Sequence, residues 1–121
     1  MTITVLTIDD SKAIRDMVAF SLQPHGYRVI GAADGAEGLE KLRAERPALV
    51  ITDLNMPVMN GLDFIRQARQ DAAGSGIPIV MLTTESKPEL KAEGKAAGAT
   101  GWINKPFDAA MLVSVTKKLA G

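Results

Sequence analysis

The sequence predicts a doubly wound α/β sandwich, built from five parallel strands and five helices in alternation. Five short apolar runs alternate with five amphipathic stretches along the 121 residues. The apolar runs lack in/out alternation, which is typical of parallel strands that are buried on both faces. Right-handed crossovers then place helices on both sides of the sheet. A chain of this length is typical of one domain, so we expect a single domain over residues 1–121.

The first strand and the first helix are predicted from local pattern. Residues 3–8 form an apolar, β-branched run with threonines between, which favours a strand. A helix follows from Lys12 and ends at Pro24 and Gly26. The residues that recur at helical spacing on its inner face are Ile14, Met17, Val18, Ser21 and Leu22.

The second strand covers residues 27–32, and the third covers residues 49–51, which lead into Asp53. Between them, Asp34 and Glu37 have the spacing of a capping box, in which each residue's side chain satisfies a free backbone N–H of the first helical turn. The helix that they open buries Leu39 and Leu42.

The third helix includes residues 62–68, and the fourth strand covers residues 79–82 and ends at Thr83. Ser86 and Glu89 then have the spacing of a second capping box, which predicts a fourth helix that is capped by Ser86, has Pro88 in its first turn and ends at Gly98. The fifth strand covers residues 101–103. Asp108 caps a last helix with an inner face of Leu112, Val115 and Leu119.

Composition excludes several kinds of site. The chain has no cysteine, which excludes disulfides, Cys-ligated zinc and iron–sulfur clusters. Its one histidine, His25, leaves little room for a His-based metal cluster. The net charge of zero gives no electrostatic footprint for nucleic acid or an anionic membrane. Because no apolar run approaches the roughly 20 residues that span a bilayer, and no signal peptide is evident, we expect a cytoplasmic protein without membrane insertion.

Polar side chains follow four of the predicted strands at the point where each strand ends. They are Asp9 and Asp10, Asp53, Thr83 and Lys105. The C-terminal ends of parallel strands lie at one edge of a sheet, where such folds bind ligands. Each residue alone has an ordinary structural explanation, such as a helix cap, a turn or a solvated charge. Their joint placement at one edge favours a functional site.

Three neighbouring carboxylates repel one another, so a cation is expected among them. Oxygen ligands favour Mg²⁺ over Zn²⁺, with Mn²⁺ as an alternative ion. An aspartate that lies between a metal ion and a lysine is a competent nucleophile toward phosphorus, and its product is an aspartyl phosphate.

With these residues in place, the sequence closely resembles the receiver domain of bacterial two-component response regulators. The resemblance covers the chain from Val5 to the last helix. It rests on four segments, which are Ile8-Asp9-Asp10-Ser11, Ile51 to Pro57 with Asn60-Gly61, Met81 to Thr84, and Gly98 to Phe107. It implies a flavodoxin-like, CheY-like sheet of strand order 2-1-3-4-5 and a stand-alone response regulator without an output domain.

The resemblance also implies the roles of the acidic residues. Asp53 would accept a phosphoryl group from a phosphohistidine on a sensor kinase. Asp10 and Asp53 would bind Mg²⁺ directly, together with the backbone carbonyl of Asn55, while Asp9 would act through a metal-bound water. On this interpretation the chain is not an enzyme, since it catalyses only its own phosphorylation and dephosphorylation.

The remaining site residues are assigned by the same resemblance. Lys105, Thr83 and Thr84 would bind the phosphoryl group, and the bond from Lys105 to Pro106 would be a cis peptide. Thr83 and Trp102 match the family's switch pair, in which the hydroxyl moves to the phosphate and the aromatic ring turns inward.

Two further positions tune loss of the phosphoryl group in this family, and here they are Asn55 and Glu85. Their amide and carboxylate could orient an attacking water, so we expect rapid autodephosphorylation.

The partner surface is expected on the fourth helix, fifth strand and fifth helix. Lysines at every fourth residue form a basic stripe there, beside Trp102: Lys87, Lys91 and Lys95. The resemblance is strongest to the chemotaxis branch, which implies a chemotaxis histidine kinase and a flagellar motor switch protein as partners of a monomer.

Three alternatives stay open. A phosphorelay shuttle or phosphate-sink receiver has the same chemistry at the site and differs only in its partner. A phosphohydrolase that forms an aspartyl phosphate would need a second aspartate at position 55, where this chain has Asn55. A flavodoxin-type electron carrier would need a phosphate-binding loop after the first strand, where Asp9 and Asp10 would repel a flavin phosphate.

Overall fold

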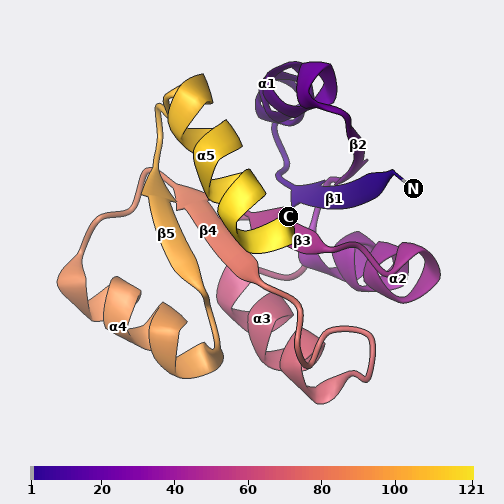
Figure 1. Ribbon diagram of the computed structural model, residues 1–121. Coiled ribbons are helices and arrows are strands. Elements are labelled where there is room, and N and C mark those ends of the chain that lie inside the picture. Colours follow the sequence, from indigo (N-terminus) through magenta and orange to yellow (C-terminus); the bar gives the residue numbers. More distant parts are fainter. Residues whose placement is uncertain (1) are drawn as a thin grey trace.

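The computed structural model describes residues 2–121 and contains one parallel five-stranded sheet between two layers of helices (Figure 1). The strand order is β2-β1-β3-β4-β5, and every pair of neighbouring strands is parallel. The strands are β1 Ile3–Ile8, β2 Tyr27–Ala32, β3 Leu49–Thr52, β4 Ile79–Thr83 and β5 Gly101–Asn104. The predicted fold class and strand order are therefore confirmed.

Within residues 2–121, each strand is followed by an α-helix, and a single 3₁₀ turn over Gln23–His25 follows the first helix. The helices are α1 Lys12–Leu22, α2 Gly35–Glu45, α3 Gly61–Gln70, α4 Pro88–Ala97 and α5 Ala109–Ala120. None of the helices within residues 2–121 has the length and apolar character needed to cross a bilayer.

Four of the helices begin at a side-chain cap. The capping oxygens of Ser11, Asp34, Asn60 and Asp108 each accept a backbone N–H from the first helical turn. Such a cap typically contributes about 1 kcal/mol, because it satisfies a donor that the helix cannot. All four caps lie in the loop that follows a strand, so they fix the direction in which the chain leaves the edge of the sheet that carries the acidic residues.

The fourth helix has Pro88 in its first turn, as predicted, but its cap differs from the prediction. It starts at Pro88, its N-cap is Lys87, and no side chain caps it, so the capping box predicted at Ser86 is wrong. The reason is steric, because a proline ring disfavours the helical conformation for the residue before it. Lys87 accordingly has extended backbone angles, φ −64° and ψ 132°, and cannot be the first helical residue of a turn capped by Ser86.

The sheet separates two hydrophobic clusters. Helices α2, α3 and α4 cover one face, where Phe64, Ile65 and Leu42 are fully buried against β1, β3 and β4. Helices α1 and α5 cover the other face, where Val18 and Leu112 pack on the same strands (Figure 1). Because strands β1, β3 and β4 carry buried side chains on both faces, the polar groups at their C-terminal ends are held by a rigid frame.

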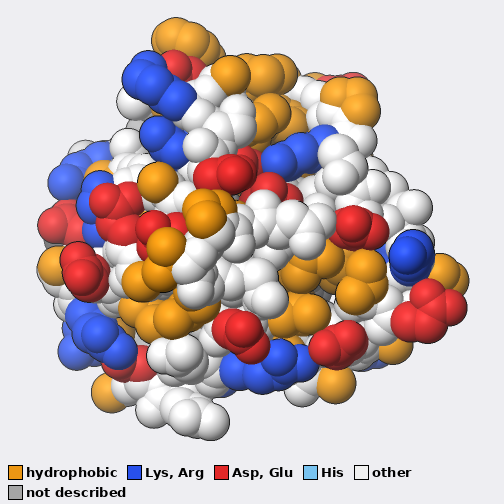
Figure 2. Space-filling view, turned by 180° about the vertical axis from the view of Figure 1, so that it is seen from behind, with side chains coloured by type: hydrophobic (Ala, Val, Ile, Leu, Met, Phe, Trp, Pro, Cys, Tyr) orange, Lys and Arg blue, Asp and Glu red, His pale blue; other side chains and the backbone are white. Residues whose placement is uncertain are grey.

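Charged side chains of both signs are interspersed over the face drawn in Figure 2. Several exposed ion pairs join different elements, and each such pair contributes at most about 1 kcal/mol. These pairs are Arg28 with Glu45 at 2.7 Å, Arg43 with Asp71 at 2.6 Å, and Arg66 with Glu93 at 3.1 Å.

Candidate functional site

The candidate site lies at the C-terminal edge of the sheet, where strand register sets its residues side by side. Ile8 of β1 is paired with Thr52 of β3, so the residues that follow them, Asp9 and Asp53, leave the sheet together. The backbone N–H of Asp53 donates to the carbonyl oxygen of Ile8 at 2.8 Å, which continues this pairing past the strand end. On the other side, the N–H of Lys105 donates to the carbonyl oxygen of Thr83 at 2.9 Å.

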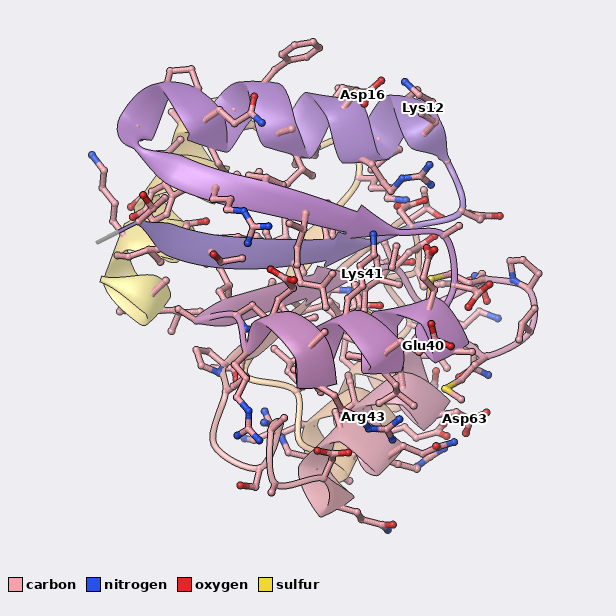
Figure 3. The ribbon with its side chains drawn as sticks, turned by 90° about the vertical axis from the view of Figure 1, so that its right-hand side faces the viewer. Lys12, Asp16, Glu40, Lys41, Arg43 and Asp63 are labelled. Atoms are coloured by element: carbon pink, nitrogen blue, oxygen red, sulfur yellow. The ribbon has the colours of Figure 1, made fainter. Side chains whose placement is uncertain are left out.

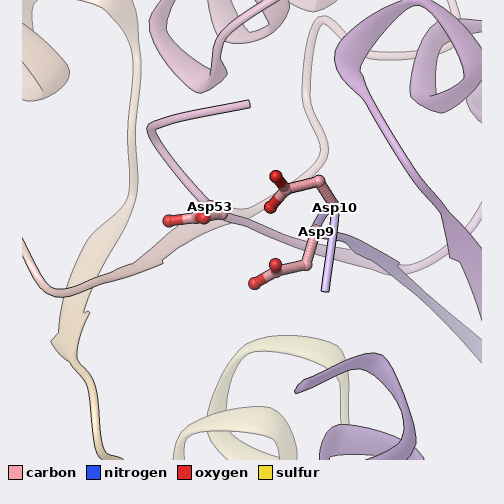
Figure 4. A group of neighbouring side chains, drawn as sticks. All are labelled: Asp9, Asp10 and Asp53. Carbon is pink, nitrogen blue, oxygen red and sulfur yellow. The ribbon is translucent and has the colours of Figure 1, made fainter. Parts of the chain in front are cut away.

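Asp9, Asp10 and Asp53 form one acidic cluster (Figure 4). One carboxylate oxygen of each residue lies within 4.8 Å of those of the other two. Asp9 and Asp53 are buried, with exposed fractions of 2% and 8%, whereas Asp10 is exposed. The cluster is therefore closed on the side of the sheet and open to solvent on the side of Asp10.

Lys105 places a positive charge against this cluster. Its Nζ lies 2.7 Å from Oδ2 of Asp9 and 3.4 Å from Oδ2 of Asp53, and its side chain is only 13% exposed. The peptide bond between Lys105 and Pro106 is cis, as the family resemblance implies. Lys105 thus joins the ends of β1, β3 and β5 at one point.

Backbone N–H groups hold the other oxygens of the two buried carboxylates. Oδ1 of Asp9 accepts from the N–H of Ser11 at 2.9 Å, and Oδ1 of Asp53 accepts from the N–H of Leu54 at 2.8 Å. Gly61 contacts the carbonyl oxygen of Asp53 so closely that a Cβ at position 61 would overlap it. A residue larger than glycine would therefore displace the backbone of Asp53.

Burial raises the pKa of the Asp53 carboxyl above its ordinary value of 3.8, since desolvation disfavours the charged form. The positive charge of Lys105 opposes this rise in pKa, and the negative charge of Asp9 adds to it. Burial is thus the main cause of the raised pKa of Asp53, because the effect of Lys105 on this pKa is larger than that of Asp9.

These groups suit a hard divalent cation. The clustered side-chain donors are carboxylate oxygens, which Mg²⁺ prefers, and the open side at Asp10 leaves room for the waters that Mg²⁺ retains. A dication here would stabilise the ionised form of Asp53 against the effect of burial, and it would also relieve the smaller repulsion from Asp9.

Asn55 and Glu85 lie together, although they come from different loops. Nδ2 of Asn55 donates a hydrogen bond to Oε1 of Glu85 at 3.2 Å. This contact joins the loop after β3 to the loop after β4. Sequence reasoning placed both residues near the site separately but did not anticipate that they bond to each other.

Glu85 is also the contact point between Thr83 and Trp102. Oγ1 of the buried Thr83 accepts from the N–H of Glu85 at 3.2 Å, and Nε1 of Trp102 donates to the carbonyl oxygen of Glu85 at 3.0 Å. The two residues of the predicted switch pair are thus connected through one peptide segment of the β4–α4 loop.

The indole of Trp102 lies against α4. A Cβ at Gly94 would come within 3.0 Å of Cζ3 of Trp102, and Gly94 is the one buried residue of α4. The glycine therefore leaves the space that the indole occupies.

The predicted partner residues lie outside the acidic cluster. Lys87, Lys91 and Lys95 are exposed, and the last two line a surface pocket together with Trp102 and Thr100. Thr84 is exposed just after β4. The structure thus separates a reactive edge from a basic, aromatic surface.

Sequence reasoning missed one residue at the site, which is Arg15. Its Nη1 donates to the backbone carbonyl oxygen of Asp9 at 2.6 Å. The helical pattern of α1 gives Arg15 a polar position and carries no sign of this contact. The one local signal is Gly31, a glycine inside strand β2 that packs against the arginine side chain.

Comparison with known proteins agrees with this geometry. The family model of the response regulator receiver domain matches residues 5–117. Protein PilH of Pseudomonas aeruginosa is 35% identical over 118 residues, which cover 97% of this chain and 98% of PilH.

Solved structures give the same result. The chemotaxis protein CheY4 of Vibrio cholerae is 46% identical with a TM-score of 0.93, and the match covers 98% of this chain and 99% of that one. A CheY-like receiver domain protein from Methanospirillum hungatei is 30% identical with a TM-score of 0.91, over 98% of this chain and 93% of that one. The family match, these likenesses and the acidic edge lead to one conclusion: the chain belongs to the response regulator receiver domain family of two-component signalling.

Proposed function

We propose that the chain is a phosphorylation switch in which Asp53 accepts a phosphoryl group from a phosphohistidine on a sensor kinase. The observation that carries this proposal is the setting of Asp53, a buried carboxylate held between Lys105 and two further aspartates at one sheet edge. Such a carboxylate is a nucleophile without a general base, because at neutral pH no proton has to be removed from it.

In the proposed step, a carboxylate oxygen of Asp53 bonds to phosphorus while the phosphorus–nitrogen bond of phosphohistidine breaks. The electron pair of that bond returns to the imidazole nitrogen. The other ring nitrogen of the phosphohistidine carries a proton, so the kinase histidine leaves as neutral imidazole. Lys105, now shared between Asp9 and Asp53, pairs with an oxygen of the transferred group. The hydroxyls of Thr83 and Thr84 donate to its other oxygens.

Asp9, Asp10, Asp53 and the backbone carbonyl of Asn55 would hold Mg²⁺, with Asp9 acting through a metal-bound water. When bound, the ion neutralises negative charge on the carboxylate and phosphoryl oxygens that must approach each other. Lys105 alone cannot do this for three carboxylates and a phosphoryl group, because it supplies one positive charge.

The switch follows from the hydrogen bonds of Glu85. In the unphosphorylated chain, the hydroxyl oxygen of Thr83 accepts a hydrogen bond from the N–H of Glu85. This bond breaks when the hydroxyl turns to the phosphoryl group. The same segment holds the indole N–H of Trp102, so its movement changes where Trp102 sits against α4. A charge added at Asp53 thereby alters the surface of α4, β5 and α5.

Asn55 and Glu85 tune loss of the phosphoryl group in this proposal. Their side chains lie at hydrogen-bond distance and carry an amide and a carboxylate that can orient an attacking water. We therefore propose rapid autodephosphorylation, with catalysis limited to the chain's own phosphoryl group.

The proposed pathway is chemotaxis. The likeness to CheY4, which is described as a chemotaxis protein, supports this assignment. The surface of half-buried Trp102 with the exposed Lys91 and Lys95 supports it as well. The partners would be a chemotaxis histidine kinase and a flagellar motor switch protein. The chain would bind them as a monomer in the cytoplasm.

The test of the reaction is incubation of the full chain with Mg²⁺ and acetyl phosphate, followed by intact mass measurement. We expect one added phosphoryl group on the unsubstituted chain and on Asp16→Asn, a control aspartate that is ion-paired on the surface of α1. We expect none on Asp53→Asn. An unchanged mass of the unsubstituted chain, with acetyl phosphate and with a phosphorylated kinase, would contradict the proposal.

A further inference from the structure

Arg15 lies beside the acidic cluster, although the chemistry above gives it no part. Its Nη1 donates a 2.6 Å hydrogen bond to the backbone carbonyl oxygen of Asp9. This oxygen belongs to the peptide unit that joins Asp9 to Asp10, so the bond acts on the backbone between two of the three carboxylates. Because the donor is charged, the bond is stronger than one between neutral groups.

The other groups of Asp9 are already held by partners elsewhere. Its N–H donates to the carbonyl oxygen of Ala32 at 3.0 Å, and its carboxylate accepts from Ser11 and Lys105. Asp10, by contrast, is exposed. The bond from Arg15 is therefore the contact that sets the plane of the peptide from which Asp10 starts.

Gly31 of β2 is a second, independent sign that the course of Arg15 is specified. A Cβ at position 31 would lie 3.2 Å from Cδ and 3.5 Å from Nε of Arg15. A glycine inside a strand weakens the strand, and it often marks a place where another group approaches closely. Lys41 reaches from α2 to the same strand, where its Nζ donates to the carbonyl oxygen of Gly31 at 2.5 Å (Figure 3). The strand is thus held in place at the point where the arginine crosses it.

We propose that Arg15 is a positioning residue for the divalent cation: it fixes the peptide between Asp9 and Asp10 and thereby aims the carboxylate of Asp10 at the ion. The proposal rests on the proposed function, since it assumes that the three carboxylates hold Mg²⁺. Gly31 takes part by leaving room for the arginine side chain.

A positioning role and a purely electrostatic role of Arg15 predict opposite changes in Mg²⁺ affinity when Arg15 is replaced. Removing a positive charge near three carboxylates strengthens their attraction for a dication. Removing the hydrogen bond frees the Asp10 peptide and weakens binding, as with groups that orient metal ligands elsewhere, where loss typically costs about 10- to 100-fold in affinity. The direction of the change in Mg²⁺ affinity therefore distinguishes the positioning role from the electrostatic one.

The experiment is titration of the full chain with Mg²⁺ alone, with the heat of binding measured by isothermal titration calorimetry. Arg15→Met keeps an unbranched apolar stem at Gly31 but removes the donor, and we expect its Kd to be about tenfold higher than that of the unsubstituted chain. Arg28→Met is the matched control, because it removes the same charge from an exposed ion pair with Glu45. Its Kd should match that of the unsubstituted chain.

Gly31→Ala is the second variant, and it decides the matter if Arg15→Met does not fold. Its added methyl would lie 3.2 Å from Cδ of Arg15, which forces the arginine to shift without removing it, so its Kd should also rise. An equal or lower Kd in whichever of these variants folds would overturn the positioning role, while Mg²⁺ binding and Asp53 phosphorylation by the unsubstituted chain would leave the proposed function standing. Failure of the unsubstituted chain to bind Mg²⁺ would overturn both.

Discussion

At the scale of single residues, the site is a balance of charges held out of water. Asp9 and Asp53 are buried, and Lys105 lies against both of them with little exposure of its own. Burial of a carboxylate disfavours its ionised form, and one lysine between two buried carboxylates only partly compensates. Without a metal ion, the buried carboxylates therefore lower the free energy of unfolding relative to a chain with a neutral side chain in place of one of them.

The pH dependence of Asp53 follows from this balance. Its pKa in the folded chain lies above the ordinary 3.8, so the folded state holds the proton more tightly than the unfolded state does. Stability contributed by the protonated carboxyl is then lost as the pH rises from near that ordinary value through the folded pKa. In a chelator at pH 7, Asp53→Asn should melt a few degrees above the unsubstituted chain, and the difference should shrink on acidification. Thermal melts across pH test this, and a lower melting temperature for Asp53→Asn at pH 7 would contradict it.

Removal of Lys105 should have the opposite effect. Lys105→Met leaves two buried carboxylates without their cation, and breaking a buried pair in this way typically costs about 3 kcal/mol or more. Urea unfolding at pH 7 without metal should show this loss in the free energy of unfolding. Lys12→Met is the control, since its ion pair with Asp16 is exposed and should contribute under about 1 kcal/mol. Equal losses of unfolding free energy in the two variants would show that the ion pairs of Lys105 contribute no more to stability than an exposed pair.

At the scale of elements, α4 and β5 pack together through a contact between Gly94 of the helix and the indole of Trp102 of the strand. Gly94 is buried in the middle of α4, where a glycine costs about 1 kcal/mol relative to alanine. The indole of Trp102 occupies the space that a Cβ would take, and its N–H reaches the carbonyl oxygen of Glu85. The helix thus gives up some intrinsic stability so that Trp102 can lie against it.

Gly94→Ala tests this match. In the unsubstituted background the new methyl should displace the indole, which shifts Trp102 fluorescence and removes the gain in helix propensity. In a Trp102→Val background the same change should stabilise the chain by about 1 kcal/mol, because the space is then free. Identical effects on unfolding in the two backgrounds would mean that Gly94 and Trp102 are not coupled.

At the scale of the whole molecule, the strand register brings distant residues to one edge. Lys105 and Asp9 are separated by 96 positions in the sequence, and Asn55 and Glu85 by 30. A cation bound by three carboxylates from two strand ends would stabilise the entire fold, because the unfolded chain cannot assemble them.

Mg²⁺ should therefore raise the melting temperature, and a chelator should reverse the effect. At a free concentration of 100 times its Kd, an ion that binds only the folded state adds about 2.7 kcal/mol. The gain should be smaller in Asp53→Asn, which has lost one ligand. Scanning calorimetry with and without Mg²⁺ measures both values, and no shift in the unsubstituted chain would contradict a site for this ion.

Local chemistry explains how much of this could be predicted from the sequence. Strands such as Ile3–Ile8 and the caps at Asp34 and Asp108 depend on neighbouring residues, and their prediction is confirmed. The cap at Ser86 failed because the effect of Pro88 on Lys87 outweighs the capping-box spacing.

The contacts that could not be predicted are those between loops and across strands. The carboxylates, Thr83 and Lys105 could be placed at one edge, because parallel strands end together. The bond from Asn55 to Glu85 and that from Arg15 to the carbonyl oxygen of Asp9 depend on side-chain directions that no spacing encodes.

The measurement that tests the central claim most directly is identification of the phosphorylated residue. After incubation with Mg²⁺ and acetyl phosphate, borohydride reduces an aspartyl phosphate to homoserine, which tandem mass spectrometry locates in the peptide. We expect homoserine at position 53 and unchanged aspartate at positions 9 and 10. Homoserine at position 9 or 10 in place of position 53, or its absence from a chain shown by mass to carry the phosphoryl group, would contradict the account.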